Sequence, residues 1–178
     1  MYEHKKLLIW VEGPSDQRFF DKVIKPEFER KYGRNKVHIR QYSNMNKESV
    51  IKVTDDFEAN DDHYICVRDM DKAPCVSAKK QEMRKGEFEN VPDDRIIVVI
   101  KEMEGWYLAG LNDDSCKRLG FSSLSSTDKT GKGQFKRLQR VKFGSGRDFM
   151  IEILKSFDIE TAKRKNESFK YFAEKYGL

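Results

Sequence analysis

Acidic residues follow three apolar stretches of this sequence, each at the point where the stretch ends. The stretches cover residues 7–11, 63–69 and 95–100. The acids that close or follow them are Glu12, Asp69, Asp71, Glu102 and Glu104. A carboxylate at the end of a buried strand is costly to desolvate unless a partner compensates its charge. Oxygen ligands of this kind suit hard divalent cations, so the pattern predicts a divalent-metal site.

The spacing of these acids supports convergence on metal ions. Asp69 and Asp71 are two residues apart, which in an extended chain puts their side chains on the same side, about 6–7 Å apart. Glu12 and Asp16 are four residues apart across a turn at Gly13, so each can supply one ligand. Several carboxylates at one edge repel each other unless Mg²⁺ or Mn²⁺ lies between them. We therefore expect two ions there.

Each acid also has an ordinary explanation when it is taken alone. An Asp-x-Asp sequence is common in exposed turns, and Glu12 can simply pair with a lysine. Asp16 can be a helix N-terminal residue that the helix dipole favours and nothing more. Of Glu102 and Glu104, we expect one to face solvent. The repetition of acids after successive core strands favours the metal site.

The elements that must position these acids follow from the hydrophobic pattern. Apolar and β-branched runs alternate with helical patterns, which predicts an α/β fold with a mostly parallel four-stranded sheet flanked by helices. Acids at the ends of such strands gather at one edge. Pro26 interrupts the first helical stripe and predicts a kink or a restart there. We expect an α/β core over residues 1–112 and a helical C-terminal extension, packed on it, over residues 113–178. The expected strands are residues 7–11, 37–42, 63–69 and 95–100.

Composition bounds the class of protein. Charged residues are 37% of the chain and the net charge is +5, which permits an anionic partner. No apolar run approaches the roughly 18 residues of a membrane span, and the start resembles no signal peptide. We expect a cytoplasmic protein without a membrane partner. The three cysteines form no CxxC pair and the histidines are isolated, which argues against a zinc site, a disulfide framework or a histidine-based nucleophile.

Residues 129–147 contain no acidic side chain and predict a nucleic-acid contact. The basic residues of this segment are Lys129, Lys132, Lys136, Arg137, Arg140, Lys142 and Arg147. Lys132 stands between two glycines, where the backbone can approach a phosphate, and we expect it to stabilise a transition state. A solvated basic face is an equally good explanation. The Gly-Lys-Gly sequence is not a P-loop, so the chain alone should not hydrolyse ATP. Trp106 and Tyr107 are expected to pack in a core rather than to stack on bases.

Two motifs carry a resemblance to a known family. The segments Val11–Asp16 and Val67–Asp71 resemble the TOPRIM domain of topoisomerases, bacterial primases and OLD-type nucleases, over about residues 5–112. With Glu104, Trp106 and the late Ser168-Phe169 pair, the chain is most similar to small standalone OLD-like TOPRIM proteins. One departure is that residues 72–75 hold no glycine where many TOPRIM domains have one.

The resemblance implies a Rossmann-like fold and names roles. Glu12 would be an acid/base or metal-linked carboxylate, and Asp69 and Asp71 magnesium ligands. Asp16 and a late glutamate would be further ligands. We assign the late position to Glu104 rather than Glu102 because Trp106 follows it.

The expected activity is that of a Mg²⁺-dependent nuclease cutting DNA or RNA by a two-metal mechanism. The resemblance to OLD-type nucleases also implies a separate ATPase partner, in DNA repair or anti-phage defence. Two alternatives stay open: primase-like nucleotidyl transfer, and a non-catalytic nucleic-acid-binding or regulatory subunit. The sequence decides neither the kind of nucleic acid nor the oligomeric state.

Overall fold

The chain divides into two compact units, Met1–Val98 and Val99–Leu178. The structure, a computed structural model, describes residues 5–139 and 143–178. The sequence placed its boundary after residue 112, whereas the division of the structure falls near the end of the fourth strand.

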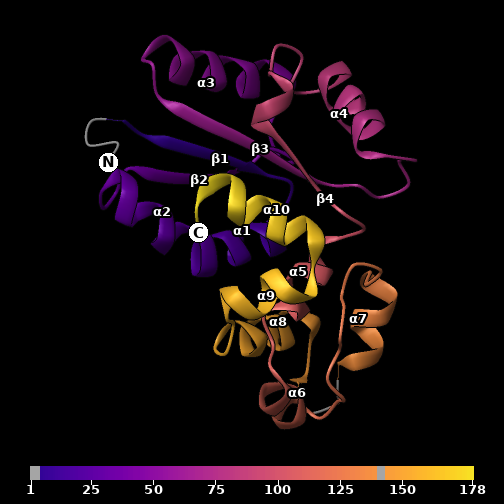
Figure 1. The fold of residues 1–178 in the computed structure, drawn as a ribbon. Helices are drawn as coiled ribbons and strands as arrows, with labels where there is room; N and C mark the ends of the chain where they lie inside the picture. Colours follow the sequence, from indigo (N-terminus) through magenta and orange to yellow (C-terminus); the bar gives the residue numbers. More distant parts are fainter. Residues whose placement is uncertain (1–4, 140–142) are drawn as a thin grey trace. The chain divides into compact units, whose positions relative to one another are not determined.

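The first unit is built on a four-stranded parallel sheet, as the sequence predicts (Figure 1). The strand order is β2-β1-β3-β4. Leu7 of β1 lies opposite Val37 of β2 and His63 of β3, so β1 has a neighbour on both sides. Every residue of β1 is buried, as expected of a central strand covered on both faces. The strands are β1 (Leu7–Val11), β2 (Val37–Gln41), β3 (His63–Asp69) and β4 (Ile96–Val99).

Helices cover both faces of this sheet. α1 and α2 lie on one face, whereas α3 and α4 lie on the other (Figure 1). Pro26 is in the first turn of α2, where its missing N–H is tolerated, so the predicted restart is confirmed. The helices are α1 (Pro14–Phe19), a π-helical turn (Phe20–Ile24), α2 (Lys25–Tyr32), α3 (Lys47–Ala59) and α4 (Val76–Lys85), and a 3₁₀ turn (Asp93–Arg95) precedes β4.

Alternation along the strands decides which side chains share a face. Leu8, Trp10, Tyr64 and Cys66 belong to one apolar cluster, and the indole N–H of Trp10 donates to Thr54 Oγ1 of α3 at 3.0 Å. This is therefore the face that α3 covers. The residues between them in sequence point to the opposite face. Continued to the end of β3, the alternation puts residue 68 on the α3 face and residue 69 on the other.

The second unit is helical and surrounds a buried helix. All of α5 is buried, and the Trp106 ring packs edge-on against Phe169 with the ring centroids 5.1 Å apart. The indole N–H of Trp106 donates to Ser168 Oγ at 2.8 Å. The predicted core role of Trp106 and Tyr107 is confirmed, since neither is exposed. The helices are α5 (Met103–Ala109), α6 (Asp113–Leu119), α7 (Lys132–Leu138), α8 (Gly146–Leu154), α9 (Ile159–Lys165) and α10 (Glu167–Tyr176).

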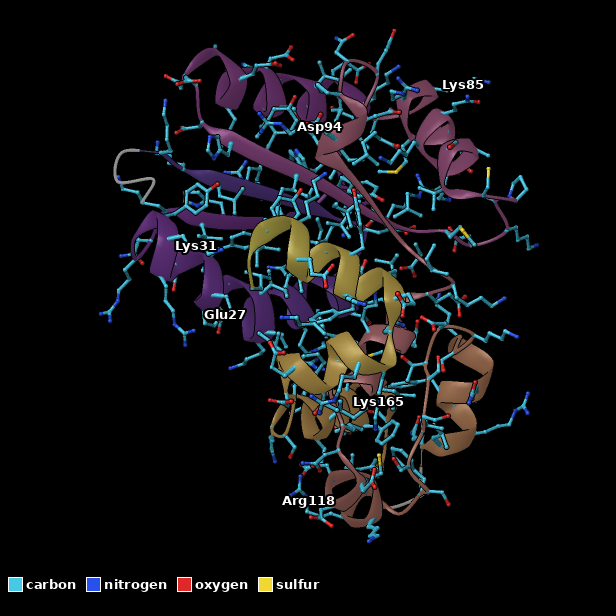
Figure 2. All side chains as sticks on the ribbon, in the orientation of Figure 1. Glu27, Lys31, Lys85, Asp94, Arg118 and Lys165 are labelled. Carbon is cyan, nitrogen blue, oxygen red and sulfur yellow. The ribbon has the colours of Figure 1, made fainter. Side chains whose placement is uncertain are left out.

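Polar side chains fix the helix ends and loops of this unit. Lys165 donates to the carbonyl of Leu111 at 2.6 Å, and Arg118 donates to the hydroxyl of Ser156 (Figure 2). Side-chain oxygens also accept backbone N–H groups at four helix starts, which satisfies donors that have no partner inside the helix. The capping residues are Asn112, Ser145, Asp158 and Asn166.

Two expectations about the whole chain are tested by the described residues. Among them, no helix has both the length and the apolar character needed to cross a membrane. The three cysteines are free thiols, and Cys66 and Cys116 are buried. This agrees with the expected lack of a disulfide framework.

Candidate functional site

The strand order creates a switch point between β1 and β3. The chain leaves β1 for β2 on one side and later returns to β3 on the other side. In open parallel sheets, ligands bind outside the carboxyl ends of the strands at such a point. Glu12 follows β1 directly and Asp69 is the last residue of β3. Two of the predicted site residues therefore come from the ends of neighbouring strands.

Glu12 lies beside an arginine. The register of β1 against β3 pairs Trp10 with Cys66, and its continuation puts Glu12 opposite Arg68. The Glu12 Oε2 atom is 4.0 Å from Arg68 Nε, and the Glu12 side chain is 40% exposed. On its other side, Arg68 Nη1 is 3.9 Å from Glu87 Oε2. Glu12 therefore has a cationic neighbour, as one alternative supposed, but it remains accessible to solvent and ligands.

Tyr42 completes this group, and sequence reasoning missed both Tyr42 and Arg68. Tyr42 follows β2, and its backbone N–H donates to the carbonyl of Val11 at 3.0 Å. The Tyr42 hydroxyl and Arg68 Nε are buried, and within the described part of the chain neither has a hydrogen-bond partner. The only signal in the sequence was a charged residue interrupting the apolar run of β3.

The pKa shifts of these two groups follow from their surroundings. Burial raises the pKa of the Tyr42 hydroxyl above its usual value, so the phenol is a neutral donor. Burial lowers the pKa of Arg68, but the neighbouring acidic groups outweigh it and the net shift is upward. The carboxylates among them are those of Glu12, Glu82 and Glu87. Arg68 is therefore a permanent cation at the switch point.

Asp69 and Asp71 do not share an extended segment. Asp69 is buried at the end of β3, whereas Asp71 has a left-handed backbone with φ 52°. The prediction that both side chains point to the same side of an extended chain is wrong, because the strand ends at Asp69. Aspartate tolerates this conformation better than most residues.

The carboxylate of Asp71 is bound to a buried lysine. Asp71 Oδ2 accepts a hydrogen bond from Lys79 Nζ at 3.0 Å, and Glu82 Oε1 accepts a second at 3.1 Å. The Lys79 side chain is only 2% exposed. The charge of Asp71 is therefore compensated within the chain, and its carboxylate fixes the loop between β3 and α4.

Asp16 serves the start of α1. Its Oδ2 accepts the backbone N–H of Gly13 at 3.2 Å, and the residue stands in the first turn of the helix. This is the contact expected of a helix N-terminal carboxylate, the alternative that the sequence left open.

The two late glutamates belong to the second unit and differ in exposure, since Glu102 is half-buried and Glu104 is buried. Glu104 is buried in the first turn of α5. Glu102 Oε1 is 3.8 Å from Lys132 Nζ, and Glu102 Oε2 accepts the backbone N–H of Lys132. A Cβ at Gly131 would lie 2.5 Å from Glu102 Oε2, so the glycine permits this approach. The Glu102 side chain is 21% exposed beside Lys132, whereas Glu104 is 7% exposed, so Glu102 is the glutamate that reaches solvent.

The basic side chains of residues 129–147 are exposed where the structure describes them. These are Lys129, Lys132, Lys136, Arg137 and Arg147. Arg140 and Lys142 lie outside the described residues. Residues 99–178 contain 16 Lys and Arg against 11 Asp and Glu, whereas residues 1–98 contain 19 of each. The net charge of +5 therefore belongs entirely to the second unit.

The donors at the switch point suit magnesium in kind and number. Over residues 5–139 and 143–178, no three His, Cys, Asp or Glu side chains gather as a metal-binding group. Mg²⁺, however, keeps several waters and takes one or two carboxylates alongside substrate phosphates. Glu12 and Asp69 are carboxylates at adjacent strand ends, although the alternation along β3 puts Asp69 on the face opposite to Arg68, the neighbour of Glu12.

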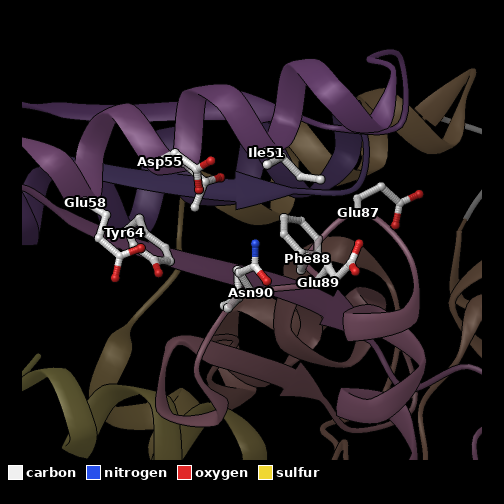
Figure 3. A pocket seen from close by; sticks show the side chains of 10 residues that line it. Ile51, Asp55, Glu58, Tyr64, Glu87, Phe88, Glu89 and Asn90 are labelled. Carbon is white, nitrogen blue, oxygen red and sulfur yellow. The ribbon is translucent and has the colours of Figure 1, made fainter.

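A pocket lies elsewhere in the first unit, between α3 and residues 87–91 (Figure 3). Its apolar wall includes Tyr64 and Phe88. Its rim is acidic, and the side chains of Asp55, Glu58, Glu87 and Glu89 line it. Neither Glu12 nor Asp69 lines this pocket, whereas Glu87, which is 3.9 Å from Arg68, does.

Comparisons with known proteins add no family assignment. A scan against protein-family models, a search of curated proteins and a search of solved structures each give no match to this chain.

Proposed function

We propose that the chain is a Mg²⁺- or Mn²⁺-dependent nuclease of TOPRIM type, which hydrolyses phosphodiester bonds of DNA or RNA at the carboxyl ends of β1 and β3. The observation that carries the proposal is the pair of acids, Glu12 and Asp69, at the ends of the two strands flanking the switch point. The resemblance of Val11–Asp16 and Val67–Asp71 to TOPRIM motifs supports it.

The side chains divide the work in the following way. Glu12 and Asp69 would hold the cation, which when bound polarises the phosphate and makes its water more acidic. Glu12, the more accessible of the two, is the group placed to take a proton from the attacking water. Asp71, held by Lys79, positions the loop that follows Asp69. We propose one cation, held by the two acids that stand at the ends of the neighbouring strands β1 and β3.

The nucleic-acid backbone would be bound by the basic side chains of the second unit. Exposed lysines and arginines that neutralise phosphates release counterions, so such binding weakens as salt rises. The exposed set is Lys129, Lys136, Arg137 and Arg147. The separate ATPase partner implied by the resemblance belongs to the same proposal.

A second candidate function is a nucleic-acid-binding module without catalysis. The observation that favours it is the presence of cations among the acids. Arg68 stands beside Glu12, and the buried Lys79 is bonded to Asp71. These pairs compensate part of the negative charge without a metal ion.

A cleavage assay separates the two candidates. The purified protein is incubated with labelled single- and double-stranded DNA and RNA in EDTA, and then with excess MgCl₂ or MnCl₂. We expect no cleavage in EDTA and cleavage after the divalent cation is restored. Equal cleavage in EDTA would contradict the metal-dependent mechanism. Salt-dependent binding without cleavage in either cation would favour the binding module.

A further inference from the structure

Three strand ends bring polar side chains together in the first unit. The backbone N–H of Tyr42 donates to the carbonyl of Val11 at 3.0 Å, and that of Ser43 donates to the carbonyl of Glu12 at 3.3 Å. The end of β2 is thereby fixed beside the end of β1. We name the side chains that meet here the strand-end cluster: Glu12, Tyr42, Arg68 and Glu87.

Arg68 sits between two acids without a hydrogen bond to either. Its nearest carboxylate oxygens, on Glu12 and Glu87, are 4.0 and 3.9 Å away, beyond the length of an N–H···O bond. Lys79, in contrast, makes both of its acid contacts at 3.0 and 3.1 Å. The two carboxylates therefore attract the Arg68 guanidinium by charge. In the described part of the chain, none of its N–H groups has a hydrogen-bond acceptor.

The buried donors of the strand-end cluster also lack hydrogen-bond acceptors within the described residues. Arg68 Nε and the Tyr42 hydroxyl are both shielded from water and lack acceptors within the described residues. The Tyr42 ring packs edge-on against Phe88, with the centroids 5.0 Å apart. Buried donors without acceptors are rare in folded proteins and call for an explanation. The N–H donors of a guanidinium form a fork that matches two oxygens of a phosphate. A guanidinium whose donors lack acceptors is therefore suited to bind a phosphate.

We propose that Arg68 is a phosphate-binding residue of this site and takes an oxygen of a nucleic-acid phosphate beside Glu12. The identity of the phosphate as part of a nucleic acid rests on the proposed function. The Arg68 side chain is 22% exposed, so solvent and ligands reach its outer nitrogens. Glu12 and Glu87 hold Arg68 in place and repel the phosphate until their charge is compensated.

The alternative is an ordinary Glu-Arg-Glu bridge that only stabilises the fold. The two explanations differ in what removing one acid does. If Arg68 binds phosphate, removal of either glutamate strengthens phosphate binding. If the bridge is only structural, removal of a glutamate lowers stability and creates no affinity for phosphate.

The test uses the full chain in EDTA with inorganic phosphate as the probe. The side-chain Nε–H signal of Arg68, assigned by through-bond NMR, is followed during the titration. Arg30 serves as the control, because it is exposed and ion-paired with Glu27 on α2. We expect the Arg68 signal to shift with saturation and the Arg30 signal to stay. Glu12→Gln and Glu87→Gln should each tighten phosphate binding about fivefold, the factor for one unit charge about 4 Å away in a water-like medium.

The outcomes distinguish this inference from the proposed function. An Arg68 signal that stays unmoved in all three proteins overturns the inference, even if nucleic acid is cleaved. A saturable shift that both variants strengthen supports it, even if no nucleic acid is cleaved with any cation. An equal shift of Arg30 would mark non-specific ion binding and would also overturn it.

Discussion

Glu12→Gln is expected to lower divalent-dependent cleavage by about 10²–10³-fold, the usual loss when one group that stabilises a transition state is removed. The substitution removes a charge from the end of β1 and keeps the shape of the side chain. Because Glu12 is 40% exposed, we expect little change in the unfolding midpoint. The rate is measured under single-turnover conditions with excess Mg²⁺.

Glu87→Gln is the matched control for this experiment. Glu87 is 36% exposed, 3.9 Å from Arg68, and its substitution removes the same charge from the same cluster. It does not follow a strand of the sheet and supplies no ligand to the proposed cation, so we expect its single-turnover rate at saturating substrate not to fall, although its substitution strengthens phosphate binding at Arg68 by about fivefold. Equal losses of cleavage rate in the two variants would show that the total negative charge of the cluster, and not the position of Glu12, controls the rate.

Lys79→Ala is expected to lower the free energy of unfolding by about 2–3 kcal/mol. The side chain is 2% exposed and bonded to Asp71 and Glu82, so its removal leaves a cavity and two carboxylates without their cation. We do not expect the full loss of stability that follows when a wholly buried ion pair is broken. The side chains of Asp71 and Glu82 are 39% and 54% exposed, so solvent screens their charges. Denaturant unfolding measures the change.

Lys79→Met separates charge from packing in this prediction. Methionine keeps most of the volume of the lysine side chain. Lys79→Met should therefore lower the free energy of unfolding by less than half as much as Lys79→Ala. Asp71→Asn should destabilise the wild type, because it breaks the pair with Lys79. In the Lys79→Met background the pair is already broken, so the same substitution should change the free energy of unfolding little. If Asp71→Asn lowers the free energy of unfolding equally in both backgrounds, the structural role assigned to the pair is contradicted.

The sequence was sufficient for the sheet and for two of the acids. The β-branched runs alternate with amphipathic patterns, and that local information predicts four parallel strands. Glu12 and Asp69 stand at the ends of such runs, so their places follow from the strands alone. Asp16 is similarly local, because its contact with Gly13 spans only three residues.

The remaining parts of the site depend on contacts between distant residues. Arg68 meets Glu12 only through the register of β3 against β1, and no local pattern contains that register. Asp71 takes its conformation where β3 ends, next to a lysine eight residues later. The contact of Lys132 with Glu102 spans 30 residues and requires the space at Gly131. Sequence spacing alone therefore assigned Asp71 and Lys132 to chemistry, whereas the structure gives each a partner within the fold.

The claim that a divalent cation binds between the ends of β1 and β3 is tested most directly with Mn²⁺ and backbone NMR. Substoichiometric Mn²⁺ broadens amide signals near its site. We predict selective broadening at Gly13 and Met70, which adjoin Glu12 and Asp69, and its loss in Asp69→Asn. Broadening that spares both residues in the wild type, or that persists unchanged in Asp69→Asn, would contradict the account.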